Sequence, residues 1–235
     1  MVAQPLGVPD SYGGYRQRLV EALRVKGIRD LAVLNAIATV PRHRFVPDGV
    51  RHRAYEDSAL PIGAGQTISQ PWVQARSLQE LRLTGKEKVL EVGGGSGYQT
   101  ALIAVVAGNV VAIERVKALA DAARETIRDL GIRNVTVVVG DGSLGWRSLA
   151  PFDAIVVAAA SPEVPAPLVE QLAVGGRMVV PIGNRDEQTL VRVDKTAGGH
   201  TVTPLSDVRF VPLLGQFGFP GAGGTSRHDN RKEPG

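Results

Sequence analysis

Short apolar runs in the middle and C-terminal half of the chain alternate with segments whose apolar positions recur at helical spacing. The apolar runs cover residues 89–92, 110–113, 135–139, 152–158 and 177–182. The predicted helices cover residues 70–83, 98–107 and 165–173. Near-continuous apolar runs are typical of strands that are buried on both faces of a parallel sheet. The alternation of the two patterns therefore predicts an α/β fold with a mostly parallel sheet.

Two amphipathic segments precede this alternating region. Their apolar faces comprise Tyr15, Leu19 and Leu23 in the first segment, and Leu31, Leu34, Ile37 and Ala38 in the second. Asp10 or Ser11 can cap the first helix, and Gly27 can end it. Asp30 can cap the second helix, which stops before Pro41. The sequence therefore predicts an N-terminal helical extension.

The C-terminal part of the chain shows two further patterns. Residues 188–193 and 202–212 alternate in polarity around Gly198 and Gly199, which predicts an antiparallel hairpin. Residues 221–235 are rich in glycine and polar side chains, so we expect a disordered tail.

The composition excludes several classes of site. The chain of 235 residues contains no cysteine, which excludes disulfides, thiolate zinc sites and cysteine nucleophiles, and which suits a reducing cytoplasm. His43, His52, His200 and His228 lack metal-ligand spacing, so we expect no metal. The first ten residues lack the basic and apolar regions of a signal peptide, and the longest apolar stretches are too short to span a bilayer. We expect a cytoplasmic protein without a membrane partner.

The positive charge of the chain is concentrated at its N-terminal end. The net charge is +4, and residues 1–53 hold nine Lys and Arg against four Asp and Glu. The basic residues near the end of this region are Arg42, His43, Arg44, Arg51, His52 and Arg53. They could attract an acidic substrate, although a solvated face is the simpler interpretation. Only 5% of residues are aromatic, so we expect no nucleic-acid partner. We also expect a monomer.

A glycine-rich segment at residues 88–97, KVLEVGGGSG, joins a predicted strand to a predicted helix. Such a turn lets a ligand approach backbone N–H groups near a helix N-terminus. The dinucleotide fingerprint G-x-G-x-x-G requires a small residue three places after Gly95, where Tyr98 stands instead. The third small residue, Gly97, comes one place early. The spacing therefore predicts a ligand site that departs from the dinucleotide pattern.

Two acidic residues follow the next two predicted strands. Glu114 ends the second apolar run, and Asp141 follows the third run, between two glycines. Three successive strands thus deliver the glycine loop and two acids to the carboxyl edge of one sheet, where open α/β sheets bind ligands. The carboxylate of Glu114 can accept hydrogen bonds from both hydroxyls of a ribose. The alternative is a nucleotide-free core whose glycines only make a turn.

This ordered set of a glycine loop and two acids resembles the class I S-adenosylmethionine-dependent methyltransferases. The resemblance implies a Rossmann-like fold with a mostly parallel, seven-stranded sheet, and S-adenosyl-L-methionine as the cofactor. It places Glu114 on the ribose and Asp141 toward the adenine. The cofactor-binding residues implied in this way are Glu91, Gly93, Gly95, Gly97, Glu114, Asp141 and Gly142.

Segments outside the cofactor motifs resemble one family of methyltransferases closely. They are VPRHRFVP at 40–47, AYED at 54–57, LPIG at 60–63, GQTIS at 65–69 and FVPL at 210–213. They resemble the protein-L-isoaspartate (D-aspartate) O-methyltransferases from about residue 15 to residue 219. The family usually has threonine at the position of Gly94, and the tail after Phe219 matches no part of the pattern.

The family resemblance implies a single methyltransferase domain over residues 1–220. Residues 1–70 would form the N-terminal extension and the substrate-binding segment, and residues 71–220 would form the cofactor-binding core. Residues 221–235 remain as the tail.

The resemblance also implies an activity: methyl transfer to the α-carboxylate of L-isoaspartyl residues in damaged proteins and peptides. The ester then closes to a succinimide, which can reopen as normal aspartate. A carboxyl group with a pKa near ~3.9 is ionised at neutral pH, so this nucleophile needs no general base. Ser69 is the implied catalytic residue because it would hold the substrate carboxylate, while residues 210–219 would close the cleft. The implied substrate-binding residues are Gly65, Gln66, Thr67 and Ile68.

Several of these assignments have alternatives. Ser69 directly precedes Gln70 and Pro71, so it can be the N-cap of the next helix, and both roles can hold together. Gln66 and Thr67 can equally form a turn. The chain could also be a relative that methylates an aspartate in a ribosomally made peptide of natural-product biosynthesis, or a catalytically silent cofactor-binding module.

Overall fold

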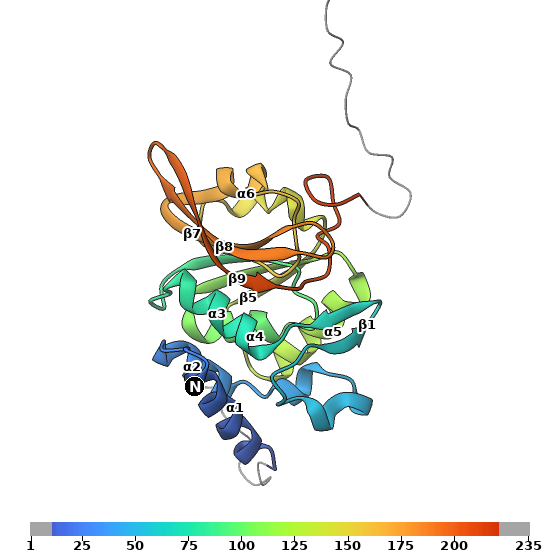
Figure 1. The fold of residues 1–235 in the computed structure, drawn as a ribbon. Coiled ribbons are helices and arrows are strands. Elements are labelled where there is room, and N and C mark those ends of the chain that lie inside the picture. Colours follow the sequence, from blue (N-terminus) through green and yellow to red (C-terminus); the bar gives the residue numbers. More distant parts are fainter. Residues whose placement is uncertain (1–10, 221–235) are drawn as a thin grey trace, which may run out of the picture.

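The computed structural model describes residues 11–220 and contains one large mixed sheet (Figure 1). Its strands are β3 (Lys88–Val92), β4 (Asn109–Glu114), β5 (Val135–Val139), β6 (Phe152–Val157), β7 (Leu172–Gly183), β8 (Gln188–Thr196) and β9 (Gly199–Val208). Their spatial order is β5-β4-β3-β6-β7-β8-β9. The first five strands in this order are parallel, whereas β8 and β9 pair antiparallel to their neighbours. The predicted α/β class with a mostly parallel, seven-stranded sheet is confirmed.

The chain reverses its direction of winding between β3 and β6. From β3 it proceeds through β4 to the edge strand β5, and it then returns to β6 on the other side of β3. Val92 at the end of β3 is in register with Ile113 of β4 and Val157 of β6. The loops that follow these residues therefore begin at the same edge of the sheet. Such a reversal opens a crevice at the carboxyl ends of the strands, where α/β proteins bind ligands.

Helices cover both faces of the sheet. On one face lie α3 (Pro71–Leu81), α4 (Tyr98–Val106) and α5 (Lys117–Asp129), and outside α3 and α4 pack α1 (Gly13–Val25) and α2 (Leu31–Thr39) (Figure 1). The short helix α6 (Ala166–Gln171) lies on the other face. One apolar cluster runs from α1 and α2 through α3 and α4 to the sheet, and a second fills the space between the sheet and α6. The central strands read as continuous apolar runs because both of their faces are covered.

The segment between α2 and α3 contains two 3-10 helices and a small hairpin. The 3-10 helices are η1 (Arg42–Phe45) and η2 (Asp48–Arg53). The hairpin pairs β1 (Leu60–Gly63) with β2 (Gln66–Ile68). Gly63, Ala64 and Gly65 in its turn have positive φ angles of 92°, 51° and 68°. The glycines on both sides of the turn are the sequence feature that permits it.

The N-terminal helices lie where the sequence predicts them and bury most of the predicted faces, including Leu19, Leu23, Leu34 and Ile37. Asp30 caps α2 as predicted, since its carboxylate accepts hydrogen bonds from the N–H groups of Ala32 (2.9 Å) and Val33 (3.2 Å). The prediction that Tyr15 and Leu31 belong to buried faces is wrong, because these residues are 50% and 72% exposed. Both lie in the first turn of their helix.

Two predicted helix boundaries differ from the structure. Ser11 does not cap α1, whose N-cap residue is Tyr12 and makes no side-chain cap bond, while Asp10 lies outside the described residues. The predicted helix over 165–173 ends at Gln171, because Leu172 already pairs with β6 as the first residue of β7. The predicted hairpin of β8 and β9 is confirmed. The predicted disordered tail also lies outside the described residues.

Candidate active site

The glycine loop leaves β3 at the reversal point of the sheet and leads into α4. Gly93, Gly95 and Gly97 have φ angles of 88°, 53° and 86°, which residues with a side chain rarely adopt. The N–H of Gly93 donates to the carbonyl of Ile113 at 2.8 Å, which fastens the loop to the end of β4. A Cβ on Gly97 would lie 2.9 Å from the Cβ of Ala123 in α5. The glycines therefore fix the shape of the loop and permit close helix packing beneath it.

Glu114 binds the glycine loop from the end of β4. Its Oε2 accepts a 2.8 Å hydrogen bond from the N–H of Gly95, and its Oε1 accepts one of 2.8 Å from the N–H of Val116. The residue is 6% exposed. Each carboxylate oxygen carries two lone pairs, so both can also accept from a ribose hydroxyl. Glu114 thus has a structural role that the sequence pattern did not indicate, in addition to its predicted ribose role.

Asp141 lies just after β5 and contacts the C-terminal segment. Its Oδ1 accepts hydrogen bonds from the N–H (2.9 Å) and the Oγ (2.7 Å) of Ser143, and its Oδ2 accepts one from the N–H of Gln216 (2.9 Å). The Oγ of Ser143 in turn accepts a hydrogen bond from the N–H of Phe217 at 3.0 Å. The C-terminal segment is therefore tied to the residue that the family resemblance places toward the adenine.

Glu91 is enclosed between β3 and α4. It is 0% exposed, and its Oε2 accepts a 2.5 Å hydrogen bond from the Oγ1 of Thr100. Its Oε1 has no partner within the part of the chain that the structure describes. Burial raises the pKa of Glu91 to about 8, against the opposing effect of the Thr100 bond and with a further upward contribution from Glu114. Glu91 joins β3 to α4 through Thr100, and its contact with a cofactor stays a prediction.

A small cavity of about 60 Å³ lies between the glycine loop and the C-terminal segment. The predicted site residues that line it are Gln66, Thr67, Gly93, Gly95, Glu114 and Gly142. Glu91, Gly97 and Asp141 do not line it. Residues 211–214 bound it on the C-terminal side. Sites for ligands of cofactor size measure about 300 Å³ or more. The donors and acceptors suit a nucleoside cofactor, and the cavity is narrower than such a ligand in this structure.

A larger cavity of about 470 Å³ adjoins the small one. Its lining residues are Ala59, Thr67, Ser69, Gln70, Trp72, Val73, Ala158 and residues 207–211. Thr67, Ala158 and Val211 line both cavities, which places the two side by side. Two of the predicted substrate-binding residues lie away from both cavities: Ile68 is 3% exposed within the core, and Gly65 lies in the hairpin turn.

Ser69 lines the larger cavity and does not cap α3. The N-cap residue is Gln70, and it makes no side-chain cap bond. Asp57 caps the helix instead, because its Oδ1 accepts a 2.8 Å hydrogen bond from the N–H of Trp72. Its Oδ2 accepts one of 2.6 Å from Lys26 Nζ. The capping interpretation of Ser69 is therefore wrong. The sequence around the start of α3 does not indicate a cap by Asp57, because Asp57 belongs to a different segment of the chain.

Arg42 departs most from the sequence interpretation, which groups it with a solvated basic face. It is 0% exposed. Its Nη1 donates to the Oε1 of Gln74 (3.0 Å) and its Nη2 to the carbonyl of Ser69 (2.9 Å). Its Cζ lies 4.8 Å from the ring centroid of Tyr98, and desolvation lowers the pKa of Arg42 to about 10. The neighbouring Arg44 is exposed, and charge patterning alone does not separate the two.

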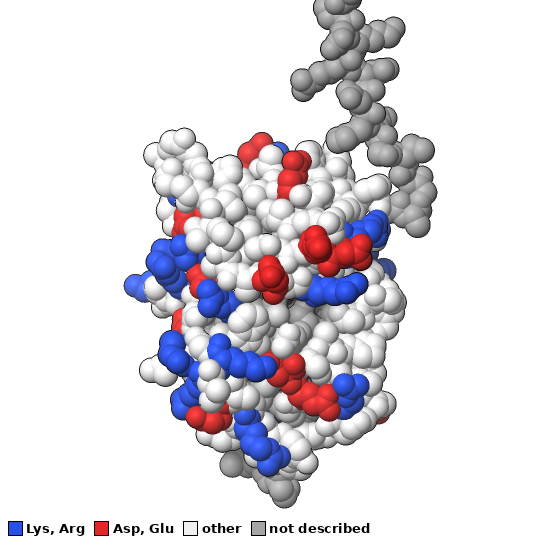
Figure 2. Space-filling view, viewed as in Figure 1, with Lys and Arg blue, Asp and Glu red and all other residues white. Residues whose placement is uncertain are grey.

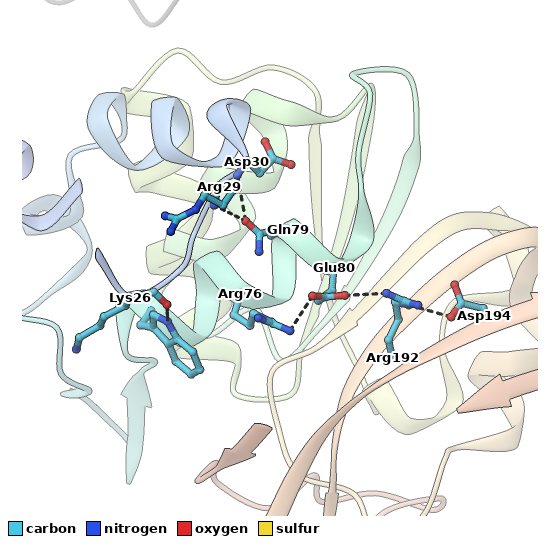
Figure 3. Close-up of polar contacts among 9 residues, drawn as sticks. Lys26, Arg29, Asp30, Arg76, Gln79, Glu80, Arg192 and Asp194 are labelled. Atoms are coloured by element: carbon cyan, nitrogen blue, oxygen red, sulfur yellow. Dashed lines mark hydrogen bonds and ion pairs between the residues drawn. The ribbon is translucent and has the colours of Figure 1, made fainter. Parts of the chain in front are cut away.

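Polar contacts hold the rest of α3 in place (Figure 3). The Oε1 of Gln79 accepts hydrogen bonds from the N–H groups of Arg29 (2.6 Å) and Asp30 (3.0 Å), which lie between α1 and α2. Glu80 pairs with Arg192 of β8 at 2.8 Å. The helix that forms one wall of the larger cavity is thereby fixed both to the N-terminal extension and to the sheet.

Two kinds of feature are absent from residues 11–220. No group of three or more His, Asp or Glu side chains in this range could hold a metal ion. None of the helices there is long and apolar enough to cross a membrane.

The strand order, the glycine loop at its reversal point and the acids after the next two strands define a class I S-adenosylmethionine-dependent methyltransferase. A sequence model of the family described as "Protein-L-isoaspartate(D-aspartate) O-methyltransferase (PCMT)" matches residues 15–218. The chain belongs to this protein-L-isoaspartate O-methyltransferase family.

Individual relatives agree with this membership. The chain is 50% identical over 207 residues to the protein-L-isoaspartate O-methyltransferase of Methanoculleus marisnigri. This alignment covers 88% of this chain and 94% of the relative. A solved protein-L-isoaspartate O-methyltransferase is 31% identical and superposes with a TM-score of 0.80. The superposition covers 86% of this chain and 67% of the solved chain. A Plasmodium falciparum relative, solved with S-adenosyl-L-homocysteine, is 30% identical and superposes with a TM-score of 0.75. The superposition covers 85% of this chain and 98% of the relative's chain.

Proposed function

We propose that this chain transfers a methyl group from S-adenosylmethionine to the α-carboxylate of L-isoaspartyl residues in damaged proteins and peptides. The observation that carries the proposal is the pair of adjoining cavities at the reversal point of the sheet, which share three lining residues. One is bounded by the glycine loop and Glu114, and the other by Ser69. A methyl donor and a methyl acceptor held in adjoining cavities can meet in a reactive geometry. Such positioning can lower the activation barrier of the transfer by about 7–11 kcal/mol.

The residues around the smaller cavity suit S-adenosylmethionine. When bound, this cofactor supplies an electrophilic methyl group on its sulfonium. Glu114 accepts hydrogen bonds from the ribose hydroxyls, and Asp141 faces the adenine. Glu91, Gly93, Gly95, Gly97 and Gly142 shape and support the same site. The S-adenosyl-L-homocysteine complex of the Plasmodium falciparum relative supports this choice of cofactor.

The residues around the larger cavity hold and orient the substrate carboxylate. A carboxyl group with a pKa near ~3.9 arrives ionised at neutral pH, so the protein need not remove a proton. Ser69 donates a hydrogen bond to the carboxylate, and Thr67, which lines both cavities, guides it toward the methyl group. Gly65, Gln66 and Ile68 fix the backbone of the hairpin that presents these side chains.

The partners of this site are isoaspartyl-containing proteins and peptides. We further propose that the chain works as a cytoplasmic monomer and that its N-terminal extension and core act as one domain. Lys and Arg side chains are interspersed with Asp and Glu over the face shown in Figure 2. A nucleic-acid partner favours a continuous basic field, so this distribution supports a protein substrate.

The proposal is tested by transfer of labelled methyl groups to two peptides that differ only in containing isoaspartate or aspartate. We expect the aspartyl peptide to react at least about 10²-fold more slowly, because its free carboxylate is the side-chain β-carboxylate, which sits on a backbone one methylene shorter and is displaced by about 1 Å or more. Comparable labelling of both peptides would indicate an aspartate-methylating relative. Cofactor binding without labelling of either would indicate a silent binding module.

A further inference from the structure

Arg42 is a buried cation that no carboxylate of residues 11–220 contacts. It is 0% exposed. Its hydrogen-bond partners are the side-chain oxygen of Gln74 and the backbone carbonyls of Ser69 and Ser58, all of which are uncharged. Its Nε has no partner among the residues that the structure describes. A buried guanidinium is ordinarily paired with a carboxylate, so this arrangement leaves a positive charge to be explained.

The carboxylate that attracts Arg42 electrostatically, Asp57, contacts other groups. Its attraction favours the charged form of Arg42, but desolvation dominates and lowers the pKa to about 10. Asp57 pairs directly with Lys26 at 2.6 Å and caps α3 through the N–H of Trp72 at 2.8 Å. Two cations thus share one carboxylate, and the group of Arg42, Lys26 and Asp57 retains a charge of +1.

This remaining charge lies directly behind one wall of the larger cavity. Arg42 donates a 2.9 Å hydrogen bond to the backbone carbonyl of Ser69, and Ser69 itself lines the cavity. Arg42 is fully enclosed, so it acts on a ligand through Ser69 and through space. A buried charge is screened much less than an exposed one. The guanidinium also lies over the ring of Tyr98, the first residue of α4, and so joins the substrate wall to the helix after the glycine loop.

We propose that Arg42 is a positioning residue for the substrate carboxylate. It fixes Ser69 through its carbonyl and supplies the buried positive charge that offsets the negative charge of the isoaspartyl α-carboxylate. This inference rests on the proposed function, because it concerns the same cavity. Methyl transfer converts the carboxylate into a neutral ester, so a charge offset favours binding of the substrate over its transition state. Arg42 therefore lowers KM without raising kcat.

The experiment measures how strongly the protein prefers a charged ligand to a neutral one. The two ligands are an isoaspartyl peptide and the matched peptide with a carboxamide in place of the α-carboxylate. Their affinities for protein saturated with S-adenosyl-L-homocysteine are measured by calorimetry in the wild type, Arg42→Lys and Arg42→Gln. Melting temperature and cofactor affinity of each variant are measured alongside.

We expect Arg42→Gln to reduce the preference for the carboxylate by at least about 10-fold, and Arg42→Lys to keep it within about 3-fold of the wild type. With saturating isoaspartyl peptide, kcat of Arg42→Gln should equal or exceed that of the wild type while KM rises. If Arg42→Gln prefers the carboxylate peptide over the carboxamide peptide as strongly as the wild type does, the proposal is overturned. An equal loss in both variants would also overturn it, because shape rather than charge would then be responsible.

Asp57→Asn tests the same charge without altering Arg42, and it decides the question if Arg42→Gln does not fold. Asparagine caps helices about as well as aspartate, so α3 keeps its cap while the local negative charge is removed. The preference for the carboxylate should then rise by about 3-fold or more. An unchanged or lower preference would contradict the proposal.

Failure of this inference can be told apart from failure of the proposed function. A wild-type protein that neither binds nor methylates isoaspartyl peptide overturns both. A wild type that methylates the peptide, together with Arg42 variants that keep its ligand preference, overturns the role of Arg42 alone.

Discussion

The N–H of Gly95 donates a 2.8 Å hydrogen bond to the carboxylate of Glu114, and this bond joins the two sequence features that are predicted to hold the cofactor. The other oxygen of the same carboxylate accepts a 2.8 Å hydrogen bond from Val116. The acid at the end of β4 therefore shapes the glycine loop after β3. Changes at Glu114 should affect the fold and the ligand together.

Glu114→Ala should lower both the melting temperature and the affinity for S-adenosyl-L-homocysteine. The variant loses two charged hydrogen bonds to backbone N–H groups, each worth about 1.5–3 kcal/mol, as well as the expected bonds to the ribose. Scanning and titration calorimetry measure the two effects. Asp121→Ala is the matched control, because it removes an acid that pairs with Lys117 on the surface of α5, and it should change neither quantity. Wild-type cofactor affinity in a folded Glu114→Ala protein would refute the ribose role.

Alanine should be tolerated at Gly94 and not at Gly97. A Cβ on Gly94 would lie 3.4 Å from the Cβ of Ala112, an ordinary contact, and the residue has no positive φ. Gly94→Ala should therefore gain about 0.4–1 kcal/mol by restricting the unfolded chain. Gly97 has a φ of 86° and its Cβ would lie 2.9 Å from that of Ala123, so alanine there should cost at least about 1–3 kcal/mol. Equal melting temperatures of the two variants would show that the loop is not held as described.

Substitution of Asp57 should lower stability, whereas substitution of Ser69 should lower activity. Asp57→Ala removes the cap of α3 and should cost about 0.5–2 kcal/mol, whereas Asp57→Asn should restore most of this loss. Ser69→Ala makes no cap defect, so its free energy of unfolding should stay within about 0.5 kcal/mol of the wild type while methyl transfer slows. Denaturant unfolding and the peptide assay measure both effects. A strongly destabilised Ser69→Ala protein with wild-type turnover would reverse these assignments.

Glu91 should make stability fall as the pH rises. Burial raises its pKa to about 8, so the folded protein keeps this carboxyl protonated at neutral pH. The unfolded carboxyl ionises near about 4.3, so between the two values the folded state binds one more proton and loses stability with increasing pH.

Glu91→Gln removes this titration and keeps an acceptor for Thr100. From about pH 5.5 to about pH 8.5, the melting temperature of the wild type should fall relative to the variant by more than about 2–4 °C, the shift that 1 kcal/mol produces in a chain of this size. Parallel melting curves over this range would mean that Glu91 is already ionised in the fold.

The parts of the fold that the sequence predicts well are those that depend on local patterns. Continuous apolar runs indicate the central strands, because both faces of those strands are covered. The glycines at positions 93, 95 and 97 mark a loop whose φ angles require them. Asp30 caps the helix that directly follows it.

The parts that the sequence does not predict depend on contacts between distant segments. The cap of α3 comes from Asp57, which precedes β1, so the nearer Ser69 is mistaken for it. Arg42 is buried although its neighbours in the basic run include exposed residues, because its guanidinium reaches Gln74 and the carbonyl of Ser69. The bond between Asp141 and Gln216 likewise joins residues that only the folded chain brings together.

The most direct test follows one isoaspartyl peptide during incubation with the protein and S-adenosylmethionine. Methylation of the α-carboxylate gives an ester that closes to a succinimide, and the succinimide reopens in part as the aspartyl peptide. We predict that chromatography detects this conversion only with cofactor present, and that Ser69→Asp abolishes it while retaining cofactor affinity, because a second negative charge repels the substrate carboxylate. An isoaspartyl peptide that stays unmethylated and unconverted with a folded, cofactor-binding protein would contradict the proposed function.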